Sequence, residues 1–206
     1  MKIIGILNQK GGVGKTTLST CLSVAYEQDK KKVALIDLDP QATACFWSDT
    51  RGKATPAVIS IQPVRLKSII DGAKANKTDI VIIDGAAVQK EIAYDVGQIA
   101  DYVLIPTKPA VFDVSSMQET IKILSQHDTP YSVILNMVSP VGQELEDFAK
   151  LAVDLNIPLC PISIGNRKDF FRAQNIGLAV QEHEPESKAT KEVIQVYNYI
   201  NQQIYK

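Results

Sequence analysis

Short runs of consecutive apolar residues are the feature that most restricts the fold of this chain. Two of them are "VALI" at Val33–Ile36 and "IVII" at Ile80–Ile83. A strand with one face in water alternates apolar and polar residues, whereas a strand inside a covered parallel sheet is apolar on both faces. These runs therefore predict a parallel sheet with helices on both sides, joined by right-handed crossovers.

Amphipathic segments alternate with the apolar runs along the whole chain. The expected strands are Lys2–Asn8, Lys32–Asp37, Val58–Gln62, Asp79–Asp84, Tyr102–Pro106, Tyr131–Met137 and Pro158–Ile162. The expected helices are Lys15–Gln28, Val64–Asn76, Gln89–Ala100, Asp113–Gln126, Gly142–Asn156, Arg167–Gly177 and Ser187–Tyr205. This alternation predicts an α/β protein that forms a single domain over residues 1–206, with Thr50–Thr55 as a turn-like insert.

Composition excludes several classes of protein. The formal net charge of -1 gives no strongly basic balance of the kind that announces nucleic-acid binding. Cys21, Cys45 and Cys160 are too widely spaced for a metal site, so we interpret them as small buried residues in a reducing compartment. No stretch approaches the roughly 20 apolar residues of a membrane span. The start of the chain lacks the features of a signal peptide, and we expect a cytoplasmic protein.

The sequence "KGGVGKTT" at Lys10–Thr17 follows the first expected strand and opens the first expected helix. It departs from the usual phosphate-loop pattern G-x-x-x-x-G-K-[ST] only at Gln9, which replaces the first glycine. Its glycines let backbone N–H groups turn toward an anion, and the helix adds the positive end of its dipole. We expect Lys15 to reach the β- and γ-phosphates and Thr16 to hold Mg²⁺. The expected nucleotide-binding residues of this loop are Gly11, Gly12, Val13, Gly14, Lys15, Thr16 and Thr17.

Carboxylates follow two other expected strands, at the edge of the sheet where the phosphate loop lies. Asp37 and Asp39 follow the second strand, and Asp84 ends the fourth. Ligands on parallel sheets bind beyond the carboxyl ends of the strands, so these groups should converge on the loop. Phosphoryl transfer to water needs a metal clamp and a group that orients the water. For Asp37 alone, a helix or turn cap explains the residue equally well.

The phosphate loop resembles that of the ParA/MinD family of ATPases, whose pattern is K-G-G-x-G-K-[ST]. The resemblance extends over essentially the whole chain, through "DLDPQ" (Asp37–Gln41), "VIIDGA" (Val81–Ala86), "VLIPTKPAVFDVSS" (Val103–Ser116), "LNM" (Leu135–Met137) and "NRKDFFRAQNIG" (Asn166–Gly177). The length and the "DGA" sequence are most similar to the short, ParF-like members that act in plasmid partition. The resemblance implies a three-layer P-loop NTPase fold, ATP and Mg²⁺ as cofactors, and Mg²⁺-dependent ATP hydrolysis.

The resemblance also implies roles for individual residues. In the family, the residue matching Lys10 crosses a dimer interface to the phosphates of the other subunit, so Lys10, Lys15 and Asp39 are the expected catalytic residues. The residue matching Asp39 orients the attacking water, and the one matching Asp84 supports Mg²⁺. The expected metal residues are Thr16, Asp37 and Asp84. Many relatives have a proline shortly after the Asp84 match, whereas glycine and alanines follow here.

Two further sites are expected from polar and basic residues. Asn136 ends an apolar strand and can present both a donor and an acceptor to adenine, although a capping or turn role fits it nearly as well. Non-specific binding of double-stranded DNA needs only a few cations per subunit, because a dimer doubles them. The expected DNA-binding residues are Arg167, Lys168, Arg172, Lys188 and Lys191. A solvated charged face is the alternative for each of them.

Three classes of protein share such an ATPase core. The first is a partition ATPase that forms an ATP-dependent homodimer, binds DNA non-specifically, associates with the nucleoid when ATP-bound and is stimulated by a small centromere-binding partner of the ParB or ParG kind. The second is a MinD-like membrane-associated or cargo-positioning ATPase. The third is a metabolic P-loop enzyme or an iron protein, which the cysteine positions and the lack of extra sequence disfavour. The C-terminal helix lacks the flanking cations of a membrane-surface helix, so we expect it to cover the sheet.

Overall fold

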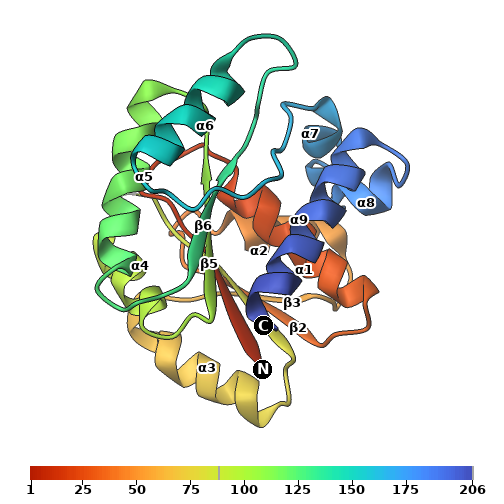
Figure 1. Cartoon of the computed structure of the whole chain (residues 1–206). Coiled ribbons are helices and arrows are strands. Elements are labelled where there is room, and N and C mark those ends of the chain that lie inside the picture. Colours follow the sequence, from red (N-terminus) through yellow and green to blue (C-terminus); the bar gives the residue numbers. More distant parts are fainter. Residues whose placement is uncertain (88, 206) are drawn as a thin grey trace.

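One sheet of parallel strands forms the centre of the computed structural model, which describes residues 1–87 and 89–205 (Figure 1). The strands lie in the order β3-β2-β4-β1-β5-β6, and each neighbouring pair is parallel. The prediction of an α/β fold with a mainly parallel sheet is therefore confirmed. The strands are β1 (Lys2–Ile6), β2 (Val33–Asp37), β3 (Ala57–Ser60), β4 (Ile80–Asp84), β5 (Tyr102–Thr107) and β6 (Tyr131–Leu135).

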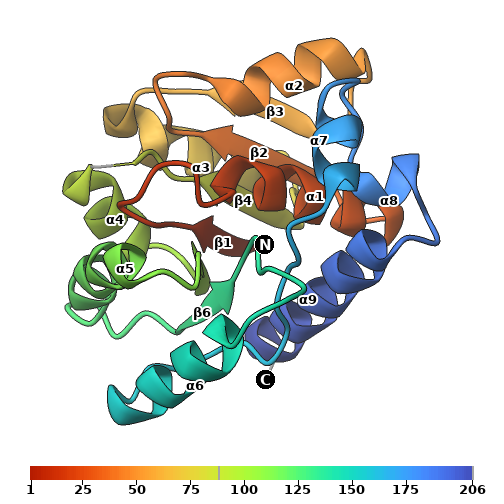
Figure 2. The same cartoon turned by 90° about the horizontal axis from the view of Figure 1, so that it is seen from above.

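Helices cover the sheet on both faces and complete three layers (Figures 1 and 2). The helices α3 to α6 lie on one face, and α1 and α9 lie on the other together with α2, α7 and α8. The helices are α1 (Lys15–Gln28), α2 (Thr43–Arg51), α3 (Leu66–Ala75, after the 3-10 turn η1 at Pro63–Arg65), α4 (Lys90–Gly97), α5 (Val111–Leu124), α6 (Glu144–Asp154), α7 (Lys168–Gln174), α8 (Val180–His183) and α9 (Lys188–Ile204).

Successive residues of the central strands serve two separate cores. In β4, Val81 and Ile83 pack with the helices of one face, while Ile80 and Ile82 pack with α1 and α9 on the other. All four side chains are fully buried. Because side chains alternate across a strand, a strand covered on both faces must be apolar at every position, and this explains the continuous apolar runs of the sequence.

Two parts of the chain differ from the sequence-based expectation. The segment Pro158–Ile162 is not a strand and joins the sheet only through an isolated bridge between Val133 and Leu159. Pro158 and Pro161 have no N–H groups, so this segment cannot continue a ladder of hydrogen bonds. Helices α2 and α8 were not expected, because α8 is short and α2, which ends in the polar residues Ser48–Arg51, lacks a clear apolar period.

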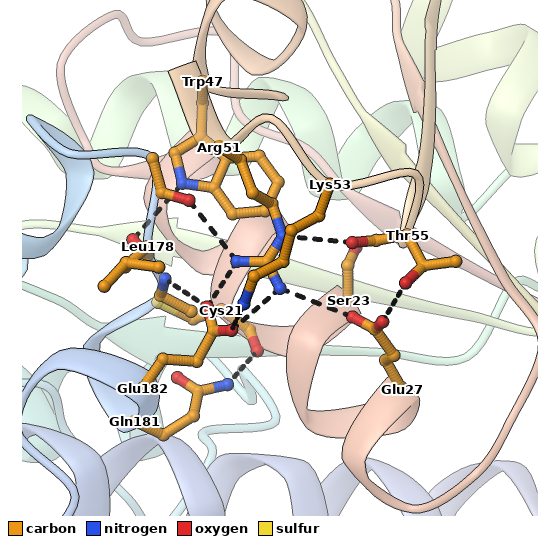
Figure 3. A network of polar contacts seen from close by, with 12 residues as sticks. Cys21, Ser23, Glu27, Trp47, Arg51, Lys53, Thr55, Leu178, Gln181 and Glu182 are labelled. Carbon is orange, nitrogen blue, oxygen red and sulfur yellow. Dashed lines mark hydrogen bonds and ion pairs between the residues drawn. The ribbon is translucent and has the colours of Figure 1, made fainter. Parts of the chain in front are cut away.

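A buried network of polar side chains anchors α2 to the helices around it (Figure 3). The guanidinium of Arg51 lies 5.2 Å from the centre of the Trp47 ring and donates to both carboxylate oxygens of Glu182 in α8. Next to Glu182, the amide of Gln181 donates at 2.7 Å to the carbonyl oxygen of Cys21 in α1. The side chain of Arg51 is only 2% exposed, so this charge is stable inside the protein only through its partners.

The C-terminal helix α9 covers the sheet, as expected. Its apolar residues Val196, Ile200 and Ile204 are buried in the same core as β1 and α1. Ser187 caps its start and accepts a hydrogen bond from the backbone N–H of Thr190 at 3.1 Å. Within residues 1–87 and 89–205, no helix is both long enough and apolar enough to cross a membrane.

Candidate nucleotide-binding site

The loop between β1 and α1 turns sharply at its glycines. Gly12 and Gly14 have φ angles of 68° and 88°, in the left-handed region that glycine adopts at little cost. A Cβ atom on Gly14 would lie 2.2 Å from Nδ2 of Asn136, so no larger residue fits there. Helix α1 starts at once, with the N–H of Leu18 donating to the carbonyl oxygen of Gly14 at 3.0 Å. The loop and the first N–H groups of α1 therefore form an anion-binding end.

Lys15 is folded into this loop. Its ammonium group is buried and donates to the carbonyl oxygen of Lys10 at 2.9 Å. Burial lowers the pKa of Lys15, and the nearby charges of Asp84 and Asp39 oppose that shift. A cation at the first position of the helix, held across its own loop, is placed to bind a phosphate that enters the loop.

Lys10 lies in a different environment from Lys15. Its side chain is 46% exposed, and its ammonium lies 3.6 Å from the carboxylate of Asp113, which is 6% exposed. Its backbone N–H donates to Oδ1 of Asn8 at 2.8 Å, which holds the start of the loop. The two lysines therefore differ in direction: one points into the loop, and the other lies at the surface beside α5.

Asp84 ends β4 directly beneath the loop. Its Oδ1 accepts a hydrogen bond from the hydroxyl of Ser19 at 3.2 Å, and its Oδ2 is buried without a hydrogen-bond partner. Burial raises the pKa of Asp84 to about 7, against the opposing effects of the nearby Thr16 hydroxyl and the Lys15 charge. A buried carboxylate oxygen without a partner is costly unless a cation or donor reaches it.

Asp37 faces Asp84 across the neighbouring strands β2 and β4. Its two oxygens accept the backbone N–H groups of Asp39 and Ala44, each at 2.9 Å, and so hold the start of α2. Burial raises the pKa of Asp37. These contacts fit the capping alternative for Asp37, and its role in metal binding stays a prediction. Asp39 lies in the loop after β2, where its Oδ1 accepts from the N–H of Gln41 at 2.9 Å.

The residues around Asp84 suit a magnesium ion that is completed by nucleotide. Among the described residues, no group of three or more His, Cys, Asp or Glu could hold a metal without help. The hydroxyl of Thr16 and the unpartnered Oδ2 of Asp84 are hard oxygen donors, which Mg²⁺ prefers. Mg²⁺ usually keeps few protein ligands and takes the rest from phosphates and water. This donor set therefore fits Mg²⁺ bound together with a nucleotide.

A pocket of about 350 Å³ opens beside the phosphate loop. The start of α1, α7 and the segment leading to α7 contribute to its lining. Phe170 and Phe171 supply aromatic surface, and Asn166 and Gln174 supply polar groups. Nucleobases bind to such mixtures of flat apolar surface and a few hydrogen-bonding groups. The sequence-based reasoning did not assign these residues, although "NRKDFFRAQ" was among the segments that carried the family resemblance.

Asn136 lies at the junction between this pocket and the phosphate loop. Its Nδ2 donates to the carbonyl oxygen of Val13 at 2.7 Å, and its Oδ1 accepts the N–H of Met137 at 2.9 Å. The amide therefore joins β6 to the loop. The expected contact with adenine stays a prediction, and it would need hydrogen-bonding capacity beyond these two contacts.

The basic residues expected to bind DNA lie in two different settings. Arg167 is ion-paired with Glu192 of α9, its Nε donating to Oε2 at 3.0 Å, and it lines the pocket beside the loop. The pKa of Arg167 is raised by this hydrogen bond. The remaining candidates are exposed at the surface; they are Lys168, Arg172, Lys188 and Lys191. Much of the charge of Arg167 is thus offset inside the protein, and DNA binding by all five residues stays a prediction.

The fold and the loop define a P-loop nucleotide-binding protein. The family model described as the CobQ/CobB/MinD/ParA nucleotide binding domain matches residues 4–180. The chain is 30% identical to the Maintenance of carboxysome distribution protein A of Gloeobacter kilaueensis over 183 residues, which cover 87% of this chain and 83% of that protein. It is 24% identical to the Protein ParA of Rhizobium radiobacter over 148 residues, 68% of this chain and 66% of that protein.

A solved structure of the cell division ATPase MinD from Pyrococcus furiosus superimposes with a TM-score of 0.81 at 21% identity, covering 98% of each chain. At that identity the likeness concerns the fold alone. Together with the family model, it confirms the P-loop NTPase fold. The chain belongs to the CobQ/CobB/MinD/ParA family of nucleotide-binding proteins.

Proposed function

We propose that this chain is a Mg²⁺-dependent ATPase that dimerises when it binds ATP and thereby positions a cargo in the cell. The observation that carries the proposal is the contrast between its two loop lysines. Lys15 is buried within its own loop, whereas the side chain of Lys10 is 46% exposed and its ammonium is ion-paired with the buried carboxylate of Asp113. A second lysine that is not needed for its own nucleotide is available to the nucleotide of a facing subunit.

The side chains around the loop have distinct tasks in this proposal. The loop N–H groups and Lys15 bind the triphosphate and neutralise charge that develops on it. Thr16 and Asp84 would hold Mg²⁺, which would supply positive charge against the negative charge of the phosphates. Asp39 orients the attacking water. Lys10 adds a cation to the phosphates of the partner subunit, so turnover is slow until the dimer forms.

For the cargo we propose DNA, as in plasmid or chromosome partition. The identity to a protein named ParA and the exposed cations of α7 and α9 support this reading. Two weak basic surfaces on an ATP-bound dimer would contact one duplex together, and their joint binding gains from effective concentration. A small centromere-binding partner would supply sequence recognition and stimulate hydrolysis. The ATP-bound protein would then be nucleoid-associated within the cytoplasm.

A protein assembly is the second candidate cargo. It is favoured by the 30% identity to a protein named for the maintenance of carboxysome distribution. In that case the ATPase cycle and the DNA surface would be the same, and the partner would belong to the assembly. A membrane-associated cycle receives less support, because the apolar side of α9 is buried in the core.

The test follows the oligomeric state in analytical ultracentrifugation with Mg²⁺ and either ATP or ADP. We expect a dimer with ATP and a monomer with ADP. Lys15→Ala should bind neither nucleotide, and Lys10→Ala should bind ATP yet remain a monomer. Lys31→Ala, an exposed lysine away from the loop, is the matched control and should behave as the wild type. ATP-dependent dimerisation of Lys10→Ala would refute the assigned role of this residue.

A further inference from the structure

A surface groove that the proposed ATPase chemistry does not use lies between α5 and α6. Both helices lie on the same face of the sheet (Figures 1 and 2). Its apolar lining comes from Val114 of α5, Phe148 and Leu151 of α6, and the Pro109–Ala110 segment that leads into α5. Val141 and Leu145, which are close to Glu144 in the sequence, are also exposed, at 79% and 42%. Apolar surface gathered at one place is typical of a site where another molecule binds.

Among the described residues, the two charged ones that line the groove are acidic. They are Glu144 and Asp147, both exposed in the first turn of α6, which also carries Glu146. Lys150 is the basic residue of that helix, and its ammonium lies 3.9 Å from Asp147. The groove thus combines an apolar floor with a negative rim, in a chain whose net charge is only -1.

This charge selects among the molecules that could cover the groove. DNA and anionic membranes carry the same sign as the rim and would be repelled. A second copy of the chain that paired through the same face would bring Glu144 and Asp147 against identical acids. A protein segment with apolar side chains beside lysine or arginine satisfies both the floor and the rim.

The helix that forms one wall of the groove also holds the start of the phosphate loop. Asp113 in the first turn of α5 is ion-paired with Lys10 at 3.6 Å, and Thr120 of α5 accepts the backbone N–H of Gln9 at 3.3 Å. At the end of β5, the carbonyl oxygen of Pro106 accepts a hydrogen bond from Nδ2 of Asn8 at 2.7 Å. A segment that presses on α5 from the groove would therefore act on the residues that place Lys10.

We propose that the α5–α6 groove is the docking site for a basic amphipathic segment of the protein partner, and that docking there stimulates ATP turnover through α5. This rests on the proposed ATPase function and names the partner surface for it. The segment binds with its apolar side chains against Val114 and Phe148 and with a cation beside Glu144 and Asp147. The contact between Asp113 and Lys10 then carries the effect to the phosphate loop.

The binding test uses a library of random dodecapeptides displayed on phage, selected on the full-length protein with a non-hydrolysable ATP analogue. We expect enriched peptides that combine basic and apolar residues. A synthetic peptide of that consensus should lose at least about tenfold in affinity, by fluorescence anisotropy, for Glu144→Lys/Asp147→Lys. The control variant Glu184→Lys/Glu186→Lys has the same net charge as the groove variant. Both of its substituted acids are exposed in the segment between α8 and α9. It should bind the peptide nearly as tightly as the wild type does.

Equal loss of affinity in both double variants would show non-specific attraction and overturn the docking site. Enriched peptides that are insensitive to the groove variant, or a selection without groove-dependent peptides, would also overturn it.

The consensus peptide should in addition raise ATP turnover of the wild type. Asp113→Asn should bind this peptide normally and lose the stimulation. Binding without any change in turnover would refute the coupling through α5. A wild type that binds the peptide but never hydrolyses ATP would refute the proposed function and leave the docking site standing.

Discussion

Nδ2 of Asn136 donates to the carbonyl oxygen of Val13 at 2.7 Å, so the end of β6 is bonded directly to the phosphate loop. The same Nδ2 lies 2.2 Å from the position that a Cβ atom on Gly14 would take. Loop and strand are thus fitted to each other at a position where the loop has a left-handed backbone. The shape of the anion-binding loop depends on a residue far away in the sequence.

Asn136→Ala should therefore weaken nucleotide binding, although Asn136 is not among the residues expected to contact the phosphates. It leaves the carbonyl oxygen of Val13 buried without its donor, which costs about 1–3 kcal/mol of stability. We expect nucleotide affinity to fall by about tenfold, since the loop is no longer held in its binding shape. Titration with a fluorescent ATP analogue and urea unfolding measure the two effects. Asn175→Ala, at an exposed position after α7, is the control, and equal effects in both variants would contradict the prediction.

Asp84→Asn should make the nucleotide-free protein more stable while it removes Mg²⁺-dependent hydrolysis. The pKa of this carboxyl is raised from 3.8 to about 7, so the folded state holds its proton more tightly than the unfolded state. The wild type therefore loses stability as pH rises from about 4 to about 7. The amide of the variant does not ionise. Its free energy of unfolding should therefore equal that of the wild type near pH 4 and exceed it by on the order of 2–4 kcal/mol above pH 7.

The measurement is urea unfolding at several pH values in EDTA and without nucleotide. Asp71→Asn removes an exposed carboxylate of α3 and should show no comparable pH-dependent gain. If Asp84→Asn is less stable than the wild type at pH 8, the cost of burying the charged carboxylate of Asp84 is offset more fully than its contacts indicate.

Arg51→Ala should destabilise the protein by about 3–5 kcal/mol, because it leaves the partly buried carboxylate of Glu182 without its main partner. The ion pair between Arg51 and Glu27, drawn in Figure 3, also joins α2 to α1, so the variant loses this link as well. Thermal and urea unfolding measure the loss of stability. Lys53→Ala removes an exposed cation from the same carboxylate at 3.1 Å and should cost less than about 1 kcal/mol. Similar losses for the two variants would show that the network owes little to burial.

Asp39→Ala should bind ATP and dimerise but hydrolyse ATP at least about a hundredfold more slowly. Binding and dimerisation should persist because Asp39 lies in the loop before α2, outside the contacts that shape the phosphate loop. Hydrolysis should slow because the attacking water loses the group that orients it. Sedimentation with ATP and phosphate release over the same period test the two halves of this expectation. Asp49→Ala, on α2 and away from the loop that carries Asp39, is the control. A monomer with ATP would contradict the water-orienting role.

Arg172→Glu should retain ATP-dependent dimerisation and lose binding to arbitrary duplex DNA. Its side chain is exposed on α7, whereas Arg167 is already paired with Glu192. We therefore expect Arg167→Glu to reduce stability as well as DNA binding. Gel shifts at several salt concentrations and flotation on anionic vesicles at matched salt separate DNA from membrane binding. ATP-dependent flotation of the wild type without a DNA shift would favour a membrane-associated cycle.

Much of the architecture could be predicted from local patterns. The continuous apolar runs indicated the buried strands, and the expected helix Lys15–Gln28 has the bounds of α1. The expected strand Pro158–Ile162 was wrong because two prolines prevent pairing, a local signal that the apolar pattern outweighed. Helix α2 was not predicted, since its stability comes from the carboxylate of Asp37 at its start and from buried Trp47 and Arg51 rather than from an apolar period.

The sequence by itself determined the chemistry of the site: a phosphate loop with two lysines, and carboxylates after the strands that end beside it. These features depend on the residue types and on their spacing over a few positions, so they can be recognised in the sequence alone. Only the tertiary structure decided which partner each side chain has. It paired Lys10 with Asp113, gave the oxygens of Asp37 to α2, left one oxygen of Asp84 without a donor, and turned Arg167 toward Glu192. These pairings join residues that are distant in the chain, and they depend on packing and burial that no local pattern contains.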